Sequence, residues 1–213
     1  MTNVWDDRAE AYRTSEAHSS GPDLDLLVKW ASGARTALDV ATGGGHVARR
    51  LREAGLEVVT CDPSPGMRPD VVCRAEDLPF ADGSFDIAAC RVAAHHFDDV
   101  AAAVGELARV APRVLVVDNL HMGEDVEQAE KLRDPSHVRN YSEAEWRGFL
   151  AAAGLEVEQV ACFDKPVELE PWLERTGCVG EEAERVRELL TAAGRLRDGR
   201  LELDRIALKG VRA

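Results

Sequence analysis

The chain has 213 residues, a length that fits one domain with a substantial core better than two smaller ones. Its 39 acidic and 26 basic residues give a formal net charge of −13, which disfavours nucleic acid and anionic membranes as partners. The five cysteines form no CxxC pair, so neither a disulfide framework nor a zinc site is expected. No run approaches the ~18 apolar residues of a membrane span and no secretory leader is recognisable, so we expect a cytoplasmic protein.

Short apolar runs alternate with helical patterns, the order typical of an α/β fold with a mostly parallel sheet and helices on both faces. Strands are expected at residues 36–41, 57–61, 71–74, 85–90, 113–118, 156–163 and 203–209. Helices are expected at residues 5–18, 23–31, 45–54, 98–111, 142–153 and 181–196. Ser142 and Glu145 form a capping-box pattern, and Gly154 supplies a stop for the same helix.

No repeat or linker divides the chain, so one domain over residues 1–213 is expected. Residues 166–200 are more than a connection between the last two strands requires. This segment is predicted to be a substrate-specificity insertion or a dimer surface, which leaves a monomer and a homodimer as alternatives.

A glycine turn, Gly43 to Gly45, follows the first predicted strand, and Asp62 ends the second. Such a turn brings backbone N–H groups close to a ligand, and an acidic side chain about 20 residues later can accept hydrogen bonds from ribose hydroxyls. The pattern predicts a nucleoside-cofactor site, for either a nicotinamide dinucleotide or S-adenosylmethionine. Asp39, a carboxylate inside an apolar strand, favours S-adenosylmethionine, because it can approach the cationic methionine end of that cofactor, whereas a pyrophosphate is anionic.

Two further motifs follow, AEDLPF at 75–80 and DGSFD at 82–86. With them the chain resembles the class I S-adenosylmethionine-dependent methyltransferases, in the UbiE-like (methyltransferase type 11) branch, from about residue 37 to residue 146. The resemblance implies a Rossmann-like, seven-stranded sheet with an antiparallel last strand, a helical lid at residues 1–32, and S-adenosylmethionine as the cofactor.

The resemblance also implies which residues hold the cofactor. Gly43 and Gly45 would contact its amino-acid part, Asp62 its ribose hydroxyls, and residues 76–78 its adenine. The full expected set is Asp39, Ala41, Gly43, Gly45, Asp62, Glu76, Asp77, Leu78 and Arg91. A turn-forming role for Asp77 and a place in the core for Leu78 are the alternatives.

Two departures from the family pattern bear on this site. Ala41 occupies the position of the family's first glycine. Only 13 residues separate Asp62 from Glu76, and they include three prolines and a glycine, which cannot form a regular helix. The crossover helix between the second and third strands is therefore expected to be missing, which leaves that edge of the sheet thin, exposed or covered by a partner.

Methyl transfer from a sulfonium is an in-line displacement that requires alignment and, for some acceptors, a base. The base candidates are His95 and His96, which follow the fourth strand near the sheet edge where open α/β folds bind ligands. As neighbours they point in different directions, so we expect one of them to face the cavity, with a packing role as the alternative. The residues expected at the acceptor are Tyr12, His96, Asn119, Arg133 and His137.

These observations predict a methyltransferase that acts on a small molecule. The first alternative is a protein that binds S-adenosylmethionine or its demethylated product without methyl transfer, such as a scaffold or a cyclase-like relative. A second alternative is a nicotinamide-dependent oxidoreductase, which Asp39 and the AEDLPF motif disfavour. His18, His46 and His121 have no metal-ligand spacing with one another or with a cysteine, so no metal site is expected.

Overall fold

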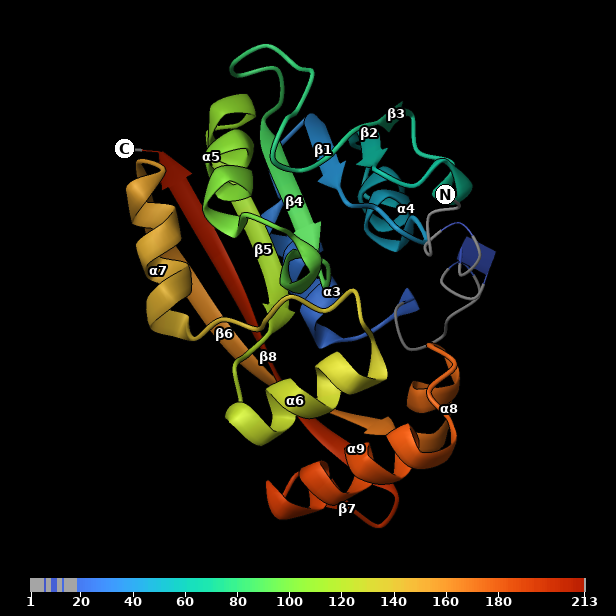
Figure 1. The fold of residues 1–213 in the computed structure, drawn as a ribbon. Coiled ribbons are helices and arrows are strands. Elements are labelled where there is room, and N and C mark those ends of the chain that lie inside the picture. Colours follow the sequence, from blue (N-terminus) through green and yellow to red (C-terminus); the bar gives the residue numbers. More distant parts are fainter. Residues whose placement is uncertain (1–5, 7–8, 11–12, 14–18, 213) are drawn as a thin grey trace.

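The sheet of the computed structural model, which describes residues 6, 9, 10, 13 and 19–212, has the strand order β3-β2-β1-β4-β5-β8-β6, with β7 paired to β8 (Figure 1). The strands are β1 (Thr36–Val40), β2 (Glu57–Asp62), β3 (Val71–Val72), β4 (Ile87–Arg91), β5 (Arg113–Asn119), β6 (Leu155–Glu168), β7 (Leu196–Arg197) and β8 (Arg200–Arg212). Neighbours from β3 to β5 are parallel, whereas β8 runs antiparallel to both β5 and β6. The Rossmann-like fold with its antiparallel last strand is confirmed, and β7 is a short addition to the seven expected strands.

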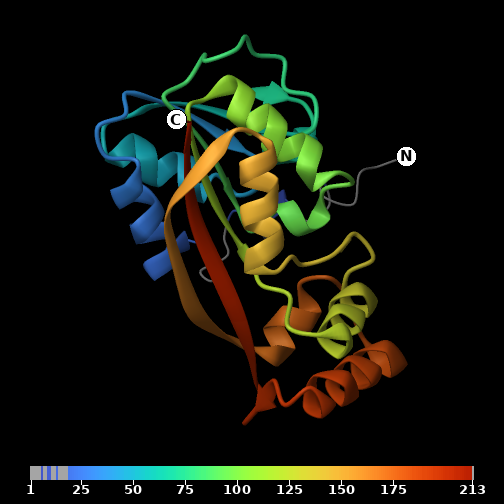
Figure 2. The same ribbon diagram turned by 90° about the vertical axis from the view of Figure 1, so that its left-hand side faces the viewer.

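Helices cover both faces of the sheet (Figure 2). They are α3 (Pro22–Trp30) and α4 (His46–Glu53) on one face, and α5 (Val100–Val110) and α7 (Glu143–Ala152) on the other. Successive side chains of a strand point to opposite faces, so Ala37 packs with α3 and α4 while Leu38 packs with α5 and α7. The central strands β1, β4 and β5 are therefore buried on both faces, and their ends are what remain open for a site.

Local hydrogen bonds explain where several elements begin and end. The N–H of Ser142 donates to the carboxylate of Glu145 at 2.9 Å and the N–H of Glu145 donates back to the Ser142 hydroxyl, which confirms the capping box. Gly154 has a left-handed φ of 77° directly after the helix, as its stop position requires. The strands β6 and β8 exceed the predicted ranges because they pair with each other along almost their whole length.

The paired strands β6 and β8 continue beyond the rest of the sheet, and three helices pack around the projecting part (Figure 1). They are α6 (Glu124–Arg133), α8 (Leu169–Glu174) and α9 (Gly180–Ala192). Their shared core contains Val126, Trp172, Leu190 and Leu201. The segment expected as an insertion thus forms the end of β6, both later helices and β7. The apolar pattern does not predict α6, which buries only two apolar side chains, or α8, which has six residues.

Between β2 and β3 the described chain forms a single 3-10 turn, Pro65–Met67, so the crossover helix is missing as predicted. The third strand has two residues in place of the predicted four, and Val72 is 56% exposed. Two residues of the N-terminal segment lie against this turn. The carboxylate of Asp6 accepts from the N–H of Gly66 at 2.7 Å, and Arg13 donates to the carbonyl oxygen of Gly66 at 2.8 Å. Most of the helix predicted at 5–18, including Tyr12, lies outside the described residues.

Candidate active site

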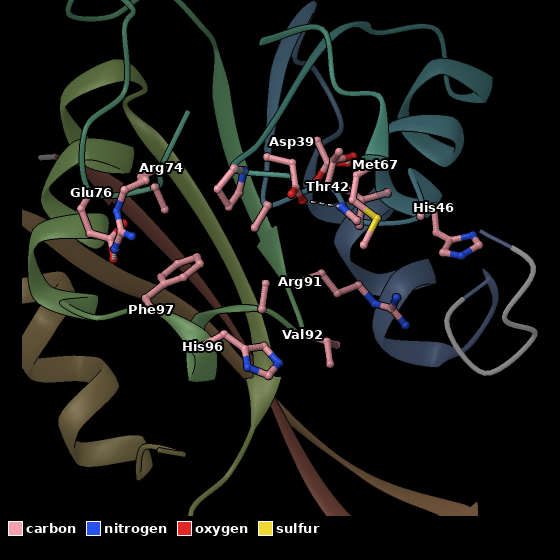
Figure 3. A pocket seen from close by; sticks show the side chains of 18 of the residues that line it. Asp39, Thr42, His46, Met67, Arg74, Glu76, Arg91, Val92, His96 and Phe97 are labelled. Carbon is pink, nitrogen blue, oxygen red and sulfur yellow. Dashed lines mark hydrogen bonds and ion pairs between the residues drawn. The ribbon is translucent and has the colours of Figure 1, made fainter. Parts of the chain in front are cut away.

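A cavity of about 290 Å³ lies at the carboxyl ends of β1, β2 and β4 (Figure 3). Such edges of open parallel sheets are where ligands bind in α/β folds. Its lining includes the predicted residues Asp39, Ala41, Gly43, Asp62, Glu76, Arg91 and His96, and also Thr42, His46, Met67, Arg74, Val92 and Phe97. Residues that the sequence predicts at the cofactor come from separate parts of the chain and line one cavity.

Asp39 is buried below the glycine loop and organises it. One carboxylate oxygen accepts from the Thr42 hydroxyl at 2.6 Å and from the N–H of Ala48, in the first turn of α4, at 3.0 Å. Burial raises the pKa of Asp39 to about 6, although both hydrogen bonds favour the charged form. A cation placed beside this carboxylate would be stabilised by it.

The loop after β1 depends on left-handed backbone conformations. Gly43 and Gly45 have φ values of 51° and 75°, which glycine adopts without steric cost. Ala41 has a φ of 53°, so a residue with a Cβ occupies a conformation that favours glycine. The alanine at this position therefore places strain in the loop.

Asp62, the last residue of β2, is turned toward the same loop. Its carboxylate accepts from the N–H of Gly43 at 3.0 Å and from the N–H of Ser64 at 2.9 Å. Burial raises its pKa, against the effect of these two hydrogen bonds. The side chain links the glycine turn to the segment that replaces the crossover helix.

The three residues expected around the adenine have different surroundings. Glu76 lines the cavity, and its carboxylate accepts from Arg74 at 3.0 Å and from the N–H of Asp98 at 3.1 Å. Asp77 is exposed, and Leu78 is buried in the core between the sheet and α5. Neither Asp77 nor Leu78 is among the lining residues, so of the three predicted positions only Glu76 borders the cavity.

His95 and His96 follow β4 on a single turn, with their ring centroids 4.1 Å apart. His95 Nδ1 lies 2.6 Å from Oδ1 of Asp118, and the backbone N–H of His95 donates to Oδ2 of Asp118 at 3.0 Å. Burial alone would lower the pKa of His95, but the charge and hydrogen bond of Asp118 outweigh it and raise this pKa. The Asp118 carboxylate therefore favours the charged form of the buried His95 imidazole.

Of these two neighbours, His96 is the one that lines the cavity (Figure 3). Burial, and then the neighbouring charge of His95, lower the pKa of His96 to about 3. Its Nδ1 lies 3.0 Å from the carbonyl oxygen of Ser136. Because a carbonyl can only accept, Nδ1 carries the proton and Nε2 holds the lone pair of a neutral imidazole.

A second, smaller cavity of about 50 Å³ adjoins the first, and Val92 and His96 line both. It is enclosed between the sheet edge and the projecting α6, α8, β6 and β8. Its lining includes His95, Asn119, Arg133 and His137, together with Glu130, Asp134, Lys165, Trp172, Arg175 and Arg205. Three of the expected acceptor residues, Asn119, Arg133 and His137, thus gather here, separated from the glycine loop by His96.

Sequence reasoning missed several lining residues. Met67 and Phe97 follow predicted site residues by a few positions but have no motif of their own. Arg205 did carry a signal, because a charged residue in the apolar run of a strand requires a partner. Its guanidinium and that of Arg91 both contact the Asp23 carboxylate, at 3.0 and 2.8 Å.

Among the described residues, one group of potential metal ligands is close together. Atoms of Glu127, Glu130 and His137 lie within 4.8 Å of one another. His137 Nε2 is 3.1 Å from Glu127, and the N–H of Asn140 donates to the same carboxylate at 3.1 Å. These contacts fix the loop after α6 onto that helix, and the expectation of no metal stays a prediction.

Comparison with known proteins agrees with this geometry. Residues 38–113 match the family model described as "Methyltransferase domain". The chain is 34% identical over 219 residues to the uncharacterized methyltransferase YcgJ of Bacillus subtilis, covering 90% of this chain and 85% of that protein. It is 35% identical over 131 residues to the demethylmenaquinone methyltransferase of Beutenbergia cavernae, about half of each chain (52%).

A solved structure of a methyltransferase from Bacillus halodurans C-125 superposes with a TM-score of 0.79 at 32% identity, covering 90% of this chain and 99% of that one. The fold and site therefore define a methyltransferase with a Rossmann-like sheet. The chain belongs to the class I S-adenosylmethionine-dependent methyltransferases, in the UbiE-like branch. None of the helices in the described part of the chain has the length and apolar composition of a membrane span.

Proposed function

We propose that the larger cavity binds S-adenosylmethionine and that the enzyme methylates a small molecule at the junction with the second cavity. The observation that carries this proposal is the buried carboxylate of Asp39 beside the glycine loop, with its pKa raised to about 6. A cationic ligand fits next to this group. A pyrophosphate would add negative charge beside Asp39 and Asp62, so the arrangement favours a sulfonium over a dinucleotide.

The cavity offers the donor and acceptor types that this cofactor requires. The glycine loop at Gly43 would hold its amino-acid part, Asp62 would accept from the ribose hydroxyls, and Glu76 and Phe97 would border the adenine. Arg91, which Asp23 holds at 2.8 Å, lines the same cavity. Bound there, S-adenosylmethionine would supply an electrophilic methyl group.

In this proposal His96 aligns the acceptor and takes its proton. The backbone oxygen of Ser136 fixes the Nδ1–H form, so Nε2 can accept a hydrogen bond from an acceptor hydroxyl. A weakly basic imidazole suffices, because an oxygen that gains a methyl group becomes strongly acidic at its remaining proton. His95, held beside Asp118, serves to position His96, and its charge contributes to the lowered pKa of His96.

The first test is calorimetric titration of ligand-free protein with S-adenosylmethionine, S-adenosylhomocysteine and NAD. Saturable binding of the two adenosyl sulfur compounds without binding of NAD is expected. Binding of NAD alone would overturn the assignment of the cavity. Formation of S-adenosylhomocysteine with a panel of small acceptors then separates a methyltransferase from a protein that only binds the cofactor.

A further inference from the structure

The second cavity is rich in positive charge although the whole chain is strongly acidic. Four cationic side chains line it, Arg133, Lys165, Arg175 and Arg205, against the two carboxylates of Glu130 and Asp134. The chain as a whole has a formal net charge of −13. A cationic cavity in such a protein is a local arrangement that the overall composition does not produce.

The charge is concentrated around one carboxylate. Asp23, 1% exposed, accepts from Arg91 at 2.8 Å and from Arg205 at 3.0 Å, and both guanidinium groups are buried. Two buried cations thus share one buried anion. Arg205 also lies near the Asp118 carboxylate, and it lines the second cavity.

Lys165 adds a third cation to this cluster. It lies on β6, and its cross-strand partner Leu203 is two residues from Arg205 on β8, so Lys165 and Arg205 are diagonal neighbours on one face. Within the described part of the chain, the Lys165 ammonium makes no hydrogen bond and no ion pair. Burial, and then the nearby Arg205, lower its pKa. The Asp23 carboxylate partly offsets this effect, but Arg91 and Arg205 already bind that carboxylate.

Further cations stand around the same space. The Arg133 guanidinium lies 4.1 Å from the Trp172 ring, and its Nε donates to the Trp172 carbonyl at 3.0 Å, so it is held in place. Arg175 contributes the fourth cation to the lining. The volume of about 50 Å³ admits a substituent of a few atoms and excludes a whole acceptor molecule.

We propose that the methyl acceptor carries an oxyanion group, a carboxylate or a phosphate, which binds between Lys165 and Arg205 in the second cavity. The body of the acceptor then extends past His96 to the cofactor cavity, since His96 and Val92 line both spaces. The oxyanion fixes one end of the molecule and His96 orients the reacting atom at the other. This assignment of the substrate class rests on the proposed methyltransferase function.

The test uses the full chain and needs no turnover. The sequence contains four lysines, Lys29, Lys131, Lys165 and Lys209, so ¹³C-methylated lysine NMR resolves each one, and the Lys165→Met variant assigns its signal. Acetate, inorganic phosphate and neutral acetamide are titrated at constant ionic strength into protein with and without S-adenosylhomocysteine. Cofactor binding is measured separately by calorimetry on the same samples.

We expect an anion to move the Lys165 signal saturably and to raise the pH at which it titrates, while acetamide has no effect and exposed Lys131 does not respond. A response to phosphate alone assigns a phosphate group, and a response to acetate shows that a carboxylate suffices. No response of Lys165 to either anion, or equal responses of Lys131 and Lys165, would overturn the proposal.

A matched pair of variants gives a second readout. In thermal unfolding, Lys165→Met should need about tenfold more anion than the wild type for the same stabilisation. Lys131→Met should need the same anion concentration as the wild type. Both should bind S-adenosylhomocysteine like the wild type. An intact Lys165 response in protein that fails to bind S-adenosylhomocysteine would count against the proposed function and leave the anion site standing.

Discussion

His95 and Asp118 form a buried pair in which Nδ1 lies 2.6 Å from Oδ1, at the turn that carries His96 toward the cofactor cavity. The two adjacent imidazoles therefore have opposite properties. The pKa of His95 is raised by the carboxylate, whereas burial and the charge of His95 lower the pKa of His96 to about 3. Environments that push the pKa values of two neighbouring titratable groups apart are typical of sites in which each group has its own role in proton transfer.

Replacing Asp118 by Asn should destabilise the protein in a pH-dependent way. The pKa of Asp118 is lowered, so its contribution to stability is present above its unfolded pKa of about 3.9 and is lost as the pH falls. The pKa of His95 is raised, so its contribution is present below an unfolded pKa of about 6.5 and is lost as the pH rises through the folded value. The pair therefore stabilises most between about pH 4 and 6.5.

We expect Asp118→Asn to lower the free energy of unfolding by about 3 kcal/mol at pH 5.5 and by clearly less at pH 9, as measured by urea denaturation. Asp125→Asn, on the exposed face of α6, is the control and should change neither value. An equal loss at both pH values would show that His95 is not charged in the folded protein.

His96→Asn should leave the affinity for S-adenosylhomocysteine unchanged and reduce kcat by about 10²- to 10⁴-fold, the range for loss of a positioned base. Because the pKa of His96 lies near 3, kcat of the wild type should show no inflection near pH 6.5. The comparison variant is His121→Asn, which lies outside both cavities and should retain activity. Loss of cofactor binding or of folding in His96→Asn would support a packing role.

The sequence predicts the sheet well because parallel strands buried on both faces are short, continuous apolar runs. Prediction from the sequence fails where an element buries polar as well as apolar side chains. Helix α6 buries Glu127 and Glu130 beside Val126 and Ala129, so its apolar period is too weak to detect. The extra length of β6 and β8 comes from their pairing with each other, a long-range contact that local pattern does not encode.

The candidate site likewise has residues that the sequence predicts and residues that it does not. Asp39 and the glycine turn are recognisable because a buried carboxylate and positive φ angles restrict residue type locally. The role of Asp118 beside His95 and the approach of Lys165 to Arg205 arise where separate segments meet. Leu78 falls in a motif whose neighbour Glu76 borders the cavity, yet its side chain packs in the core.

Asp39→Asn should weaken binding of S-adenosylmethionine by about tenfold, ~1.4 kcal/mol, because the amide keeps the hydrogen-bond acceptor but removes the charge. S-adenosylhomocysteine lacks the sulfonium and should be affected less. In the wild type, the affinity for S-adenosylmethionine should rise with pH through about 6 as Asp39 ionises, and the variant should lose this dependence. Equal weakening of both ligands would indicate that Asp39 acts only through the loop.

The same variant should make the ligand-free protein more stable at neutral pH. The folded pKa of Asp39 is raised, so folding favours its protonated form and the wild type loses stability as the pH rises from about 4 to about 6. Removing that ionisation should increase the free energy of unfolding at pH 7.5 by on the order of 2 kcal/mol, with little gain at pH 4. Urea denaturation at both pH values measures the difference, and a loss of stability at pH 7.5 would contradict the account.

Ala41→Gly should stabilise the protein, unlike most glycine substitutions. A Cβ in the left-handed region costs the folded state roughly 1–2 kcal/mol. Glycine removes this cost, but the greater freedom of the unfolded chain lowers stability by about 0.4–1 kcal/mol. With a φ of 53° at Ala41, the expected net gain is about 0.5–1 kcal/mol in urea denaturation. Ala102→Gly, at an exposed position of α5, is the matched control and should cost about 1 kcal/mol. If both variants lose stability alike, the loop carries no strain at Ala41, and the departure from the family's glycine is neutral for folding.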